Sequence, residues 1–301
     1  MTSTCTTRRT LLLGTLATGL AVAAKATAIP QVQSTSRVRT GYAPVDGLKM
    51  YYEIHGNGEP LLLLHGGLGS TAMFADMIPS LAKTRQVITV DLQAHGRTSD
   101  IDRPITYEAM ADDISALMKY LQIPKADVLG YSTGGGVALQ TTIRHPTIVR
   151  KLVVVSAAYK RSGWYPEILA AMAQMGPAMA EQMKASQLYK TYVSVAPRPD
   201  DWNVLITKMS VMLTTDYDWS KEVAAIKIPT MLVFGDADAI RPPHMVEFFA
   251  LLGGGQKDAG WDGSGMSTAR LATLPGVTHY NMLESPLLPQ VVVAFLDSPP
   301  K

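Results

Sequence analysis

The sequence predicts an α/β fold in which a mostly parallel β-sheet is flanked by helices. Short apolar segments alternate along the chain with segments of helical length and spacing, which is typical of a parallel sheet. Several apolar segments contain almost no polar residue, as expected for strands that are covered on both faces. With 301 residues, 47% of them hydrophobic and 17% charged, the chain can build one large core that carries an insertion.

The elements that the pattern predicts are taken in chain order. Strands are expected at Met50–His55, Leu61–His65, Val87–Asp91, Val128–Tyr131, Leu152–Val155 and Met231–Phe234. Helices are expected at Thr71–Ala82, Tyr107–Leu121 and Gly134–His145. A further strand is expected near the C-terminus, just before His279.

Residues 1–28 have the features of a twin-arginine export signal. Arg8 and Arg9 precede an uncharged, apolar stretch that ends in the small-residue box Ala26-Thr27-Ala28, as a signal peptidase requires. The uncharged stretch is too short to span a bilayer, and the alternative is an N-terminal anchor helix. We expect a periplasmic or secreted protein without stable membrane insertion after signal removal, with residues 29–40 as a flexible lead-in.

The charge balance gives no reason to expect a nucleic-acid partner. Residues 1–28 carry three basic side chains and no acid, so 24 basic and 25 acidic residues remain without them, a net charge of −1. The chain also has no run of five or more like charges. The only cysteine, Cys5, lies within the signal, which leaves the mature chain without a thiol for a disulfide, a metal or a nucleophile.

The regular alternation stops between residues 158 and 222. Tryptophan, proline and methionine are frequent there, and no strand pattern appears. We expect residues 158–222 to form a helical lid inserted into a core that comprises residues 41–157 and 223–301. No internal repeat divides the chain further.

Four methionines of the expected lid recur at positions i, i+3, i+7 and i+11, so that one helical face carries flexible thioethers. These are Met172, Met175, Met179 and Met183. The stripe either packs on the main domain or, with Trp164 and Tyr165, shapes an apolar acyl pocket. On the second interpretation the candidate substrate-binding residues are Leu68, Trp164, Met175 and Met179.

A Gly-x-Ser-x-Gly motif at residues 130–134 follows one expected strand and precedes a helix. A nucleophile on a tight strand-to-helix turn needs residues without bulk two places before and after it, and Gly130 and Gly134 meet that need. The dipole of the helix that begins at Thr133 favours negative charge near its N-terminus. The motif therefore predicts that Ser132 is a nucleophile.

A serine hydroxyl needs a neighbouring base, and His279 is the candidate because it follows a strand near the C-terminus. The base in turn needs a carboxylate, and Asp236 and Asp238 both follow the strand Met231–Phe234. We favour Asp238, because one more residue beyond the strand lets its side chain turn back toward the histidine. Asp236 is expected to fix the turn by bonding backbone amides.

A glycine-rich segment, His65-Gly66-Gly67-Leu68-Gly69-Ser70, comes directly after the apolar residues Leu61–Leu64 of an expected strand. Such a loop can expose amides to a substrate carbonyl oxygen, with Gly67 or Leu68 as one donor and Thr133 as the other. We name Gly67 and Thr133 as the oxyanion hole. The segment lacks the Gly-Lys-Ser/Thr ending of a phosphate loop.

These motifs resemble the α/β-hydrolase superfamily, in the serine-esterase-like branch with a lid. The resemblance runs from the loop at residues 65–67 through the segment at residues 91–98 and the Ser132 turn to Asp238 and His279. It implies an eight-stranded, mostly parallel sheet, a lid after the sixth strand, and nucleophile, acid and base in that order. Ala94 and Thr98 stand where the branch frequently has glycine and serine.

The resemblance and the motifs together predict an exported serine hydrolase that cleaves small-molecule carboxylic esters or lactones through an acyl-enzyme on Ser132. No metal or organic cofactor is expected, because the six histidines are scattered without the spacing of a zinc site. Alternatives of the same fold are a cofactor-free haloperoxidase or perhydrolase, a carbon–carbon bond hydrolase, an aminopeptidase and a non-enzymatic ligand receptor. Dehalogenases and epoxide hydrolases are disfavoured, since those relatives carry aspartate at the position of Ser132.

Overall fold

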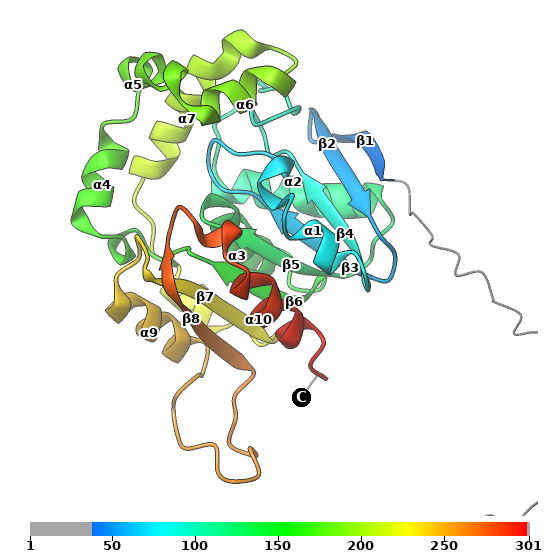
Figure 1. The fold of residues 1–301 in the computed structure, drawn as a ribbon, viewed down its shortest axis with the longest axis vertical. Helices are drawn as coiled ribbons and strands as arrows, with labels where there is room; N and C mark the ends of the chain where they lie inside the picture. The colour runs from blue at the N-terminus through cyan, green and yellow to red at the C-terminus, as the bar shows by residue number, and fades with distance from the viewer. Residues whose placement is uncertain (1–37, 300–301) are drawn as a thin grey trace, which may run out of the picture. The chain divides into compact units, whose positions relative to one another are not determined.

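The structure is a computed structural model that describes residues 38–299 (Figure 1). The predicted export signal lies outside the described residues, as does most of the predicted lead-in. We expected the folded part to start near Gly41, but the first strand already begins at Arg39. The apolar pattern missed this strand because it is an edge strand whose first residues are exposed.

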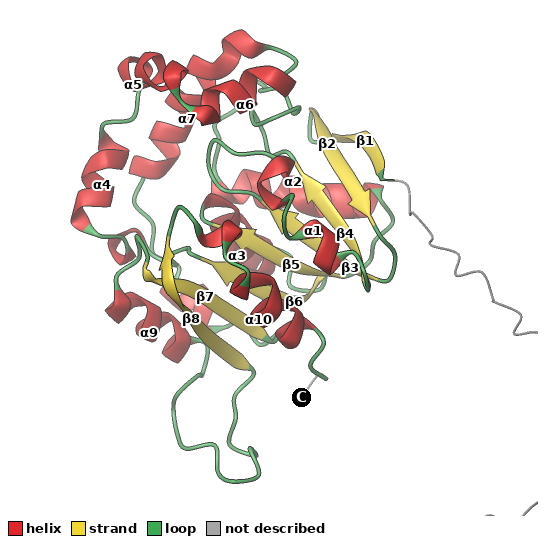
Figure 2. Ribbon diagram, in the orientation of Figure 1, coloured by secondary structure: helices red, strands yellow, loops and turns green. Residues whose placement is uncertain are grey.

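Eight strands form one sheet in the order β1-β2-β4-β3-β5-β6-β7-β8 (Figure 2). The β1–β2 and β2–β4 pairs are antiparallel and every other pair is parallel, which confirms the predicted mostly parallel sheet. The strands are β1 (Arg39–Val45), β2 (Leu48–His55), β3 (Glu59–Leu64), β4 (Arg85–Val90), β5 (Ala126–Tyr131), β6 (Val149–Val155), β7 (Thr230–Ala237) and β8 (Ala269–Thr278).

Helices cover both faces of this sheet, which explains why its central strands are almost wholly apolar. Successive leucines of β3 point to opposite faces: Leu62 joins one core cluster and Leu63 joins the other. The first cluster includes residues of α2 (Tyr107–Tyr120), α3 (Thr133–Arg144) and α9 (Pro242–Leu251). The second includes residues of α1 (Ile78–Leu81) and α10 (Leu287–Leu296).

The helix expected at Thr71–Ala82 is not continuous. A 3₁₀-helix, η1 (Thr71–Phe74), is followed by the single α-helical turn α1. Pro79 lies in the first turn of α1, where a missing amide hydrogen costs nothing, but it cannot continue a helix from the preceding residues. The proline therefore begins a new helix instead of extending the first.

Between β6 and β7 the chain forms a group of helices: α4 (Pro166–Ala173), α5 (Pro177–Gln182), α6 (Gln187–Val195), α7 (Trp202–Thr214) and α8 (Ser220–Ala224). Helices α5, α6 and α7 lie together at the top of Figure 1 and α4 lies below them at the left, with α7 in contact with α4, α5 and α6. The methionine stripe was expected on one helix, but α4 ends at Ala173 and a new helix, α5, begins at Pro177 within the stripe. None of the helices in residues 38–299 is long and apolar enough to cross a membrane.

Candidate active site

Ser132 occupies the turn between β5 and α3, with a positive φ of 54° that side chains rarely adopt. The turn is possible only because its neighbours lack side chains. A Cβ added to Gly130 would lie 2.0 Å from the carbonyl oxygen of Gly134, and one added to Gly134 would lie 2.1 Å from that of Leu64. The two glycines of the motif therefore let α3 pack directly against the ends of β5 and β3.

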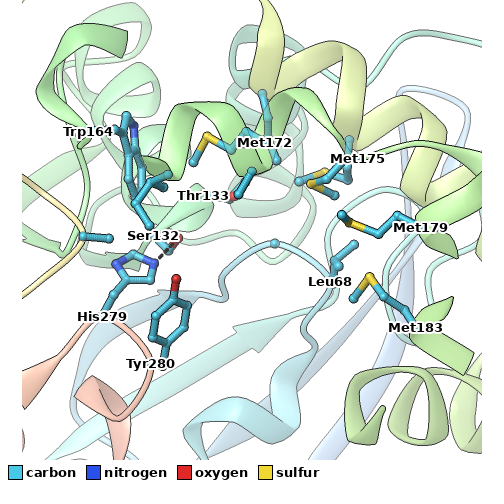
Figure 3. A pocket seen from close by; sticks show the side chains of 16 residues that line it. Leu68, Ser132, Thr133, Trp164, Met172, Met175, Met179, Met183, His279 and Tyr280 are labelled. Carbon is cyan, nitrogen blue, oxygen red and sulfur yellow. Dashed lines mark hydrogen bonds between the residues drawn. The ribbon is translucent and has the colours of Figure 1, made fainter. Parts of the chain in front are cut away.

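The structure brings the three predicted residues together from three separate strand ends. His279 Nε2 lies 3.0 Å from Ser132 Oγ (Figure 3), and His279 Nδ1 lies 3.1 Å from Asp238 Oδ1. His279 follows β8, and Asp238 follows β7. The side chains of His279 and Asp238 are buried, which shields the contact between them from competing water.

Asp238 accepts hydrogen bonds on both carboxylate oxygens. Oδ2 accepts from Ser156 Oγ at 2.6 Å and from the Gly235 amide at 3.0 Å, while Oδ1 faces His279. Burial raises the pKa of Asp238, but the hydrogen bonds from His279, Ser156 and Gly235 outweigh it, so the pKa lies below its usual value. At neutral pH the carboxylate is therefore charged and able to orient the imidazole.

Ser156 is a residue of the site that the sequence analysis missed. It directly follows β6, is fully buried and has a positive φ of 50°. Its amide donates to the carbonyl oxygen of Val233 at 2.8 Å, which ties the end of β6 to β7. No motif in the sequence marks a serine at this position, because its role arises from a contact with a residue 82 positions away.

Asp236, the rejected candidate for the acid, points elsewhere. Its two carboxylate oxygens accept the amides of Gly276 and Val277, at 3.0 and 3.2 Å, on the neighbouring strand β8. It was expected to bond amides of its own turn, but the pairing of β7 with β8 brings amides of a distant segment closer. Asp236 thus holds the end of β8, just before His279, and has no hydrogen bond to the imidazole.

Three aromatic side chains surround His279. Tyr131 donates from its hydroxyl to the His279 carbonyl oxygen at 2.5 Å, and its ring centroid lies 5.4 Å from the imidazole. The rings of Trp164 and Tyr280 each lie 5.5 Å from it, edge to face. Trp164 is itself fixed by a bond from its Nε1 to the hydroxyl of Tyr217. Rotation of the imidazole is consequently restricted by packing as well as by Asp238.

The backbone around Gly67, Leu68 and Thr133 borders the same cavity as Ser132. Thr133 is the first residue of α3, so its amide has no acceptor within the helix. A Cβ on Gly67 would lie 3.0 Å from both Met209 Cε and Thr133 Oγ1, so a larger residue would crowd these two side chains. This region can therefore place amide donors next to a carbonyl that reaches the serine.

His65 holds this loop as a neutral imidazole. Its Nδ1 lies 2.7 Å from the carbonyl oxygen of Gly66, and its Nε2 accepts the amide of Leu92 at 3.1 Å. Accepting at Nε2 requires that the proton sit on Nδ1. Burial lowers the pKa of His65 to about 4, so this arrangement persists at neutral pH.

A cavity of about 290 Å³ extends from Ser132 and His279 beneath the inserted helices (Figure 3). All four candidate substrate-binding residues line it: Leu68, Trp164, Met175 and Met179. So do several that the sequence analysis did not select: Ile168, Ala171, Met209, Leu213, Ala239 and Tyr280. Met172 and Met183 line it as well, although the four methionines of the stripe come from α4, the α4–α5 link, α5 and η3 (Met183–Ala185).

Residues 38–299 contain no group of three or more His, Cys, Asp or Glu side chains that could hold a metal ion.

The contact between Ser156 and Asp238 predicts a stability effect that depends on pH. Ser156→Ala removes a donor to a charged carboxylate and should lower the free energy of unfolding at pH 7 by roughly 1.5–3 kcal/mol. Because the folded-state pKa of Asp238 is depressed, this stabilisation is present above the unfolded-state value of about 3.9 and is lost as the pH falls through the folded-state value. Urea unfolding at pH 7 and at pH 3 should therefore show a large difference from the wild type at pH 7 and a smaller one at pH 3.

Ser194→Ala is the matched control, since the exposed Ser194 donates to a backbone carbonyl and contacts no carboxylate. Its effect should be small at both pH values. An effect of Ser156→Ala that is equal at the two pH values would contradict the assigned role.

Comparison with known proteins agrees with this geometry. A family model described as the alpha/beta hydrolase fold matches residues 59–194. The AB hydrolase superfamily protein YisY of Bacillus subtilis is 30% identical over 219 residues, which cover 64% of this chain and 79% of that protein. A pimeloyl-(acyl-carrier protein) methyl ester esterase of Neisseria meningitidis is 33% identical over 204 residues, covering 62% of this chain and 78% of that protein.

Among solved structures, the enol-lactonase from Burkholderia xenovorans LB400 has a TM-score of 0.66 and 22% identity, and the match covers 85% of this chain and all of that one. The fold, the family model and the relatives together show that this chain belongs to the α/β-hydrolase superfamily.

Proposed function

We propose that this hydrolase is an exported serine esterase that cleaves carboxylic esters or lactones through an acyl-enzyme on Ser132. The observation that carries the proposal is the continuous line of contacts from Asp238 through His279 to Ser132 at the end of a cavity. The esterase named among the relatives supports ester substrates as a class.

Each group in the line has a definite part in the proposed reaction. His279 Nε2 accepts the proton of Ser132 Oγ as the oxygen attacks the substrate carbonyl carbon. The carbonyl oxygen becomes an oxyanion, which the amides of Thr133 and of Gly67 or Leu68 stabilise. Collapse of the intermediate breaks the ester bond, and His279 gives the proton to the departing alcohol.

A water molecule then attacks the acyl-enzyme. His279 accepts a proton from the water and gives it to the oxygen of Ser132 as the acid departs. Throughout, Asp238 keeps the proton of the neutral imidazole on Nδ1 and stabilises the imidazolium when it forms. The lowered pKa of Asp238 suits this part, because the carboxylate stays ionised while His279 takes up a proton.

Substitution of the three residues tests the mechanism. Ser132→Ala and His279→Ala should each reduce kcat for p-nitrophenyl butyrate on the order of 10⁶-fold, and the double variant should be little worse, because the residues act as a unit. Asp238→Asn should cost less, roughly 10⁴-fold, since chiefly the tautomer is wrong. Circular dichroism of each variant checks that the fold is retained.

Asp236→Asn is the control, because Asp236 accepts hydrogen bonds from the end of β8 and has none to the imidazole. If it lowered turnover more than Asp238→Asn at equal folded fraction, the assignment of the acid would be wrong. Wild-type turnover in Ser132→Ala would contradict the serine mechanism altogether. Assays on a carbon–carbon cleavage substrate test the alternative of a carbon–carbon bond hydrolase, and assays with peroxide and halide test that of a haloperoxidase or perhydrolase. A non-enzymatic receptor would bind esters without turnover.

Export rests on the sequence of residues 1–28. Replacing Arg8 and Arg9 by lysine should leave the precursor in the cytoplasm, because paired arginines are the signal for the twin-arginine route. Cell fractionation and immunoblotting measure the distribution. Wild-type cells that hold only unprocessed, active protein in the cytoplasm would overturn this part of the proposal.

A further inference from the structure

We propose that the cavity beside Ser132 binds the acyl part of the substrate, and that this part is an uncharged, flexible alkyl chain. The inference rests on the proposed esterase function and specifies its substrate class. Three features of the cavity carry it: the direction in which it extends, the absence of charge from its walls and the adaptability of those walls.

The direction of the cavity separates acyl from alcohol. The departing alcohol takes its proton from His279 Nε2, so it must lie on the His279 side of Ser132. Met175, Met179 and Met183 lie on the other side of Ser132 from His279 in Figure 3. The methionine-lined part of the cavity therefore receives the group that stays on the serine.

The side next to His279 is open toward solvent. Tyr280 borders the cavity there and 76% of its surface is exposed. An alcohol that departs past His279 and Tyr280 can leave directly into water, which gives it little opportunity for selective contacts. Selectivity is therefore expected to lie mainly in the acyl chain.

The walls of the acyl side carry no charge. Among the described residues that line the cavity there is no lysine, arginine, aspartate or glutamate, and the polar side chains belong to Ser132, Thr133, His279 and Tyr280 near the reacting atoms. A carboxylate at the far end of an acyl chain would be removed from water without a partner, which is strongly unfavourable. Half-esters of dicarboxylic acids are consequently poor substrates on this account.

The walls are also adaptable. Five of the lining residues are methionines: Met172, Met175, Met179, Met183 and Met209. Their unbranched thioether chains have several rotatable bonds and fill irregular space, which suits a flexible alkyl chain better than a rigid ring. Met209 lies on α7, and the other four lie in the segment that runs from α4 to η3. The alkyl chain of the substrate would therefore be held between this segment and α7.

A series of p-nitrophenyl esters from acetate to octanoate tests whether the acyl chain is buried. Burial of each added methylene should raise kcat/KM about three- to fourfold over the first members of the series. A profile that is flat from acetate onward would overturn the inference. Absence of any Ser132-dependent turnover across the series would instead overturn the proposed function, so the two failures are distinguishable.

A charge introduced into the wall tests the chemistry. The wild type should prefer p-nitrophenyl octanoate over the mono-p-nitrophenyl ester of suberic acid, which differs by one terminal carboxylate, by at least about 100-fold. Met179→Lys should reduce that preference at least about tenfold, because the ammonium group pairs with the carboxylate. Met183→Lys provides the same charge at a neighbouring position if Met179→Lys fails to fold.

Two controls make the result specific. Met179→Gln has similar length without charge and should not improve cleavage of the suberate ester. Met266→Lys adds the same charge on a methionine that is 45% exposed and does not line the cavity, and should leave the preference as in the wild type. An unchanged preference in both cavity lysine variants with intact octanoate turnover, or an equal improvement in Met266→Lys, would contradict the assignment of the acyl side.

Discussion

The backbone turn at Ser132 is the constraint on which the rest of the site depends. Its positive φ places a serine side chain at the end of β5, and the close approach of Gly134 to the carbonyl of Leu64 fixes α3 against β3. The amide of Ser132 donates to the carbonyl of Val155 at 2.9 Å, so the turn is also tied to β6. Ser156, which follows Val155 in the chain, donates a hydrogen bond to Asp238. The end of β6 therefore links the turn of the serine to the carboxylate that orients its base.

Buried histidines support this arrangement as neutral groups. Burial lowers the pKa of His65, His95 and His244 to about 4, 3 and 4, so none of them is charged at neutral pH. His65 bridges the loop of Gly66 to the amide of Leu92, and His244 accepts the amide of Tyr159. Fixed tautomers thus position loops near the site without adding positive charge, in keeping with the uncharged walls of the cavity.

The sequence predicted every strand of the sheet except β1, and the strand-end positions of Ser132, Asp238 and His279 could be predicted because parallel strands bring their carboxyl ends to one edge. Local patterns could not predict contacts between distant segments. Ser156 and Asp236 make such contacts, one with the acid and one with the amides of β8. The methionine spacing indicated one helix, yet Pro177 divides it, and the side chains still line one cavity because the separate helices converge on it.

The most direct test of the account is to detect the acyl group on the serine. Full-length protein is mixed with p-nitrophenyl octanoate, quenched in acid within the first turnovers, digested and analysed by mass spectrometry. The account predicts an octanoyl group on the peptide that contains Ser132, and its absence from Ser132→Ala treated in the same way. Turnover with no acylated Ser132 in rapidly quenched samples, or an acyl group on another residue, would contradict it.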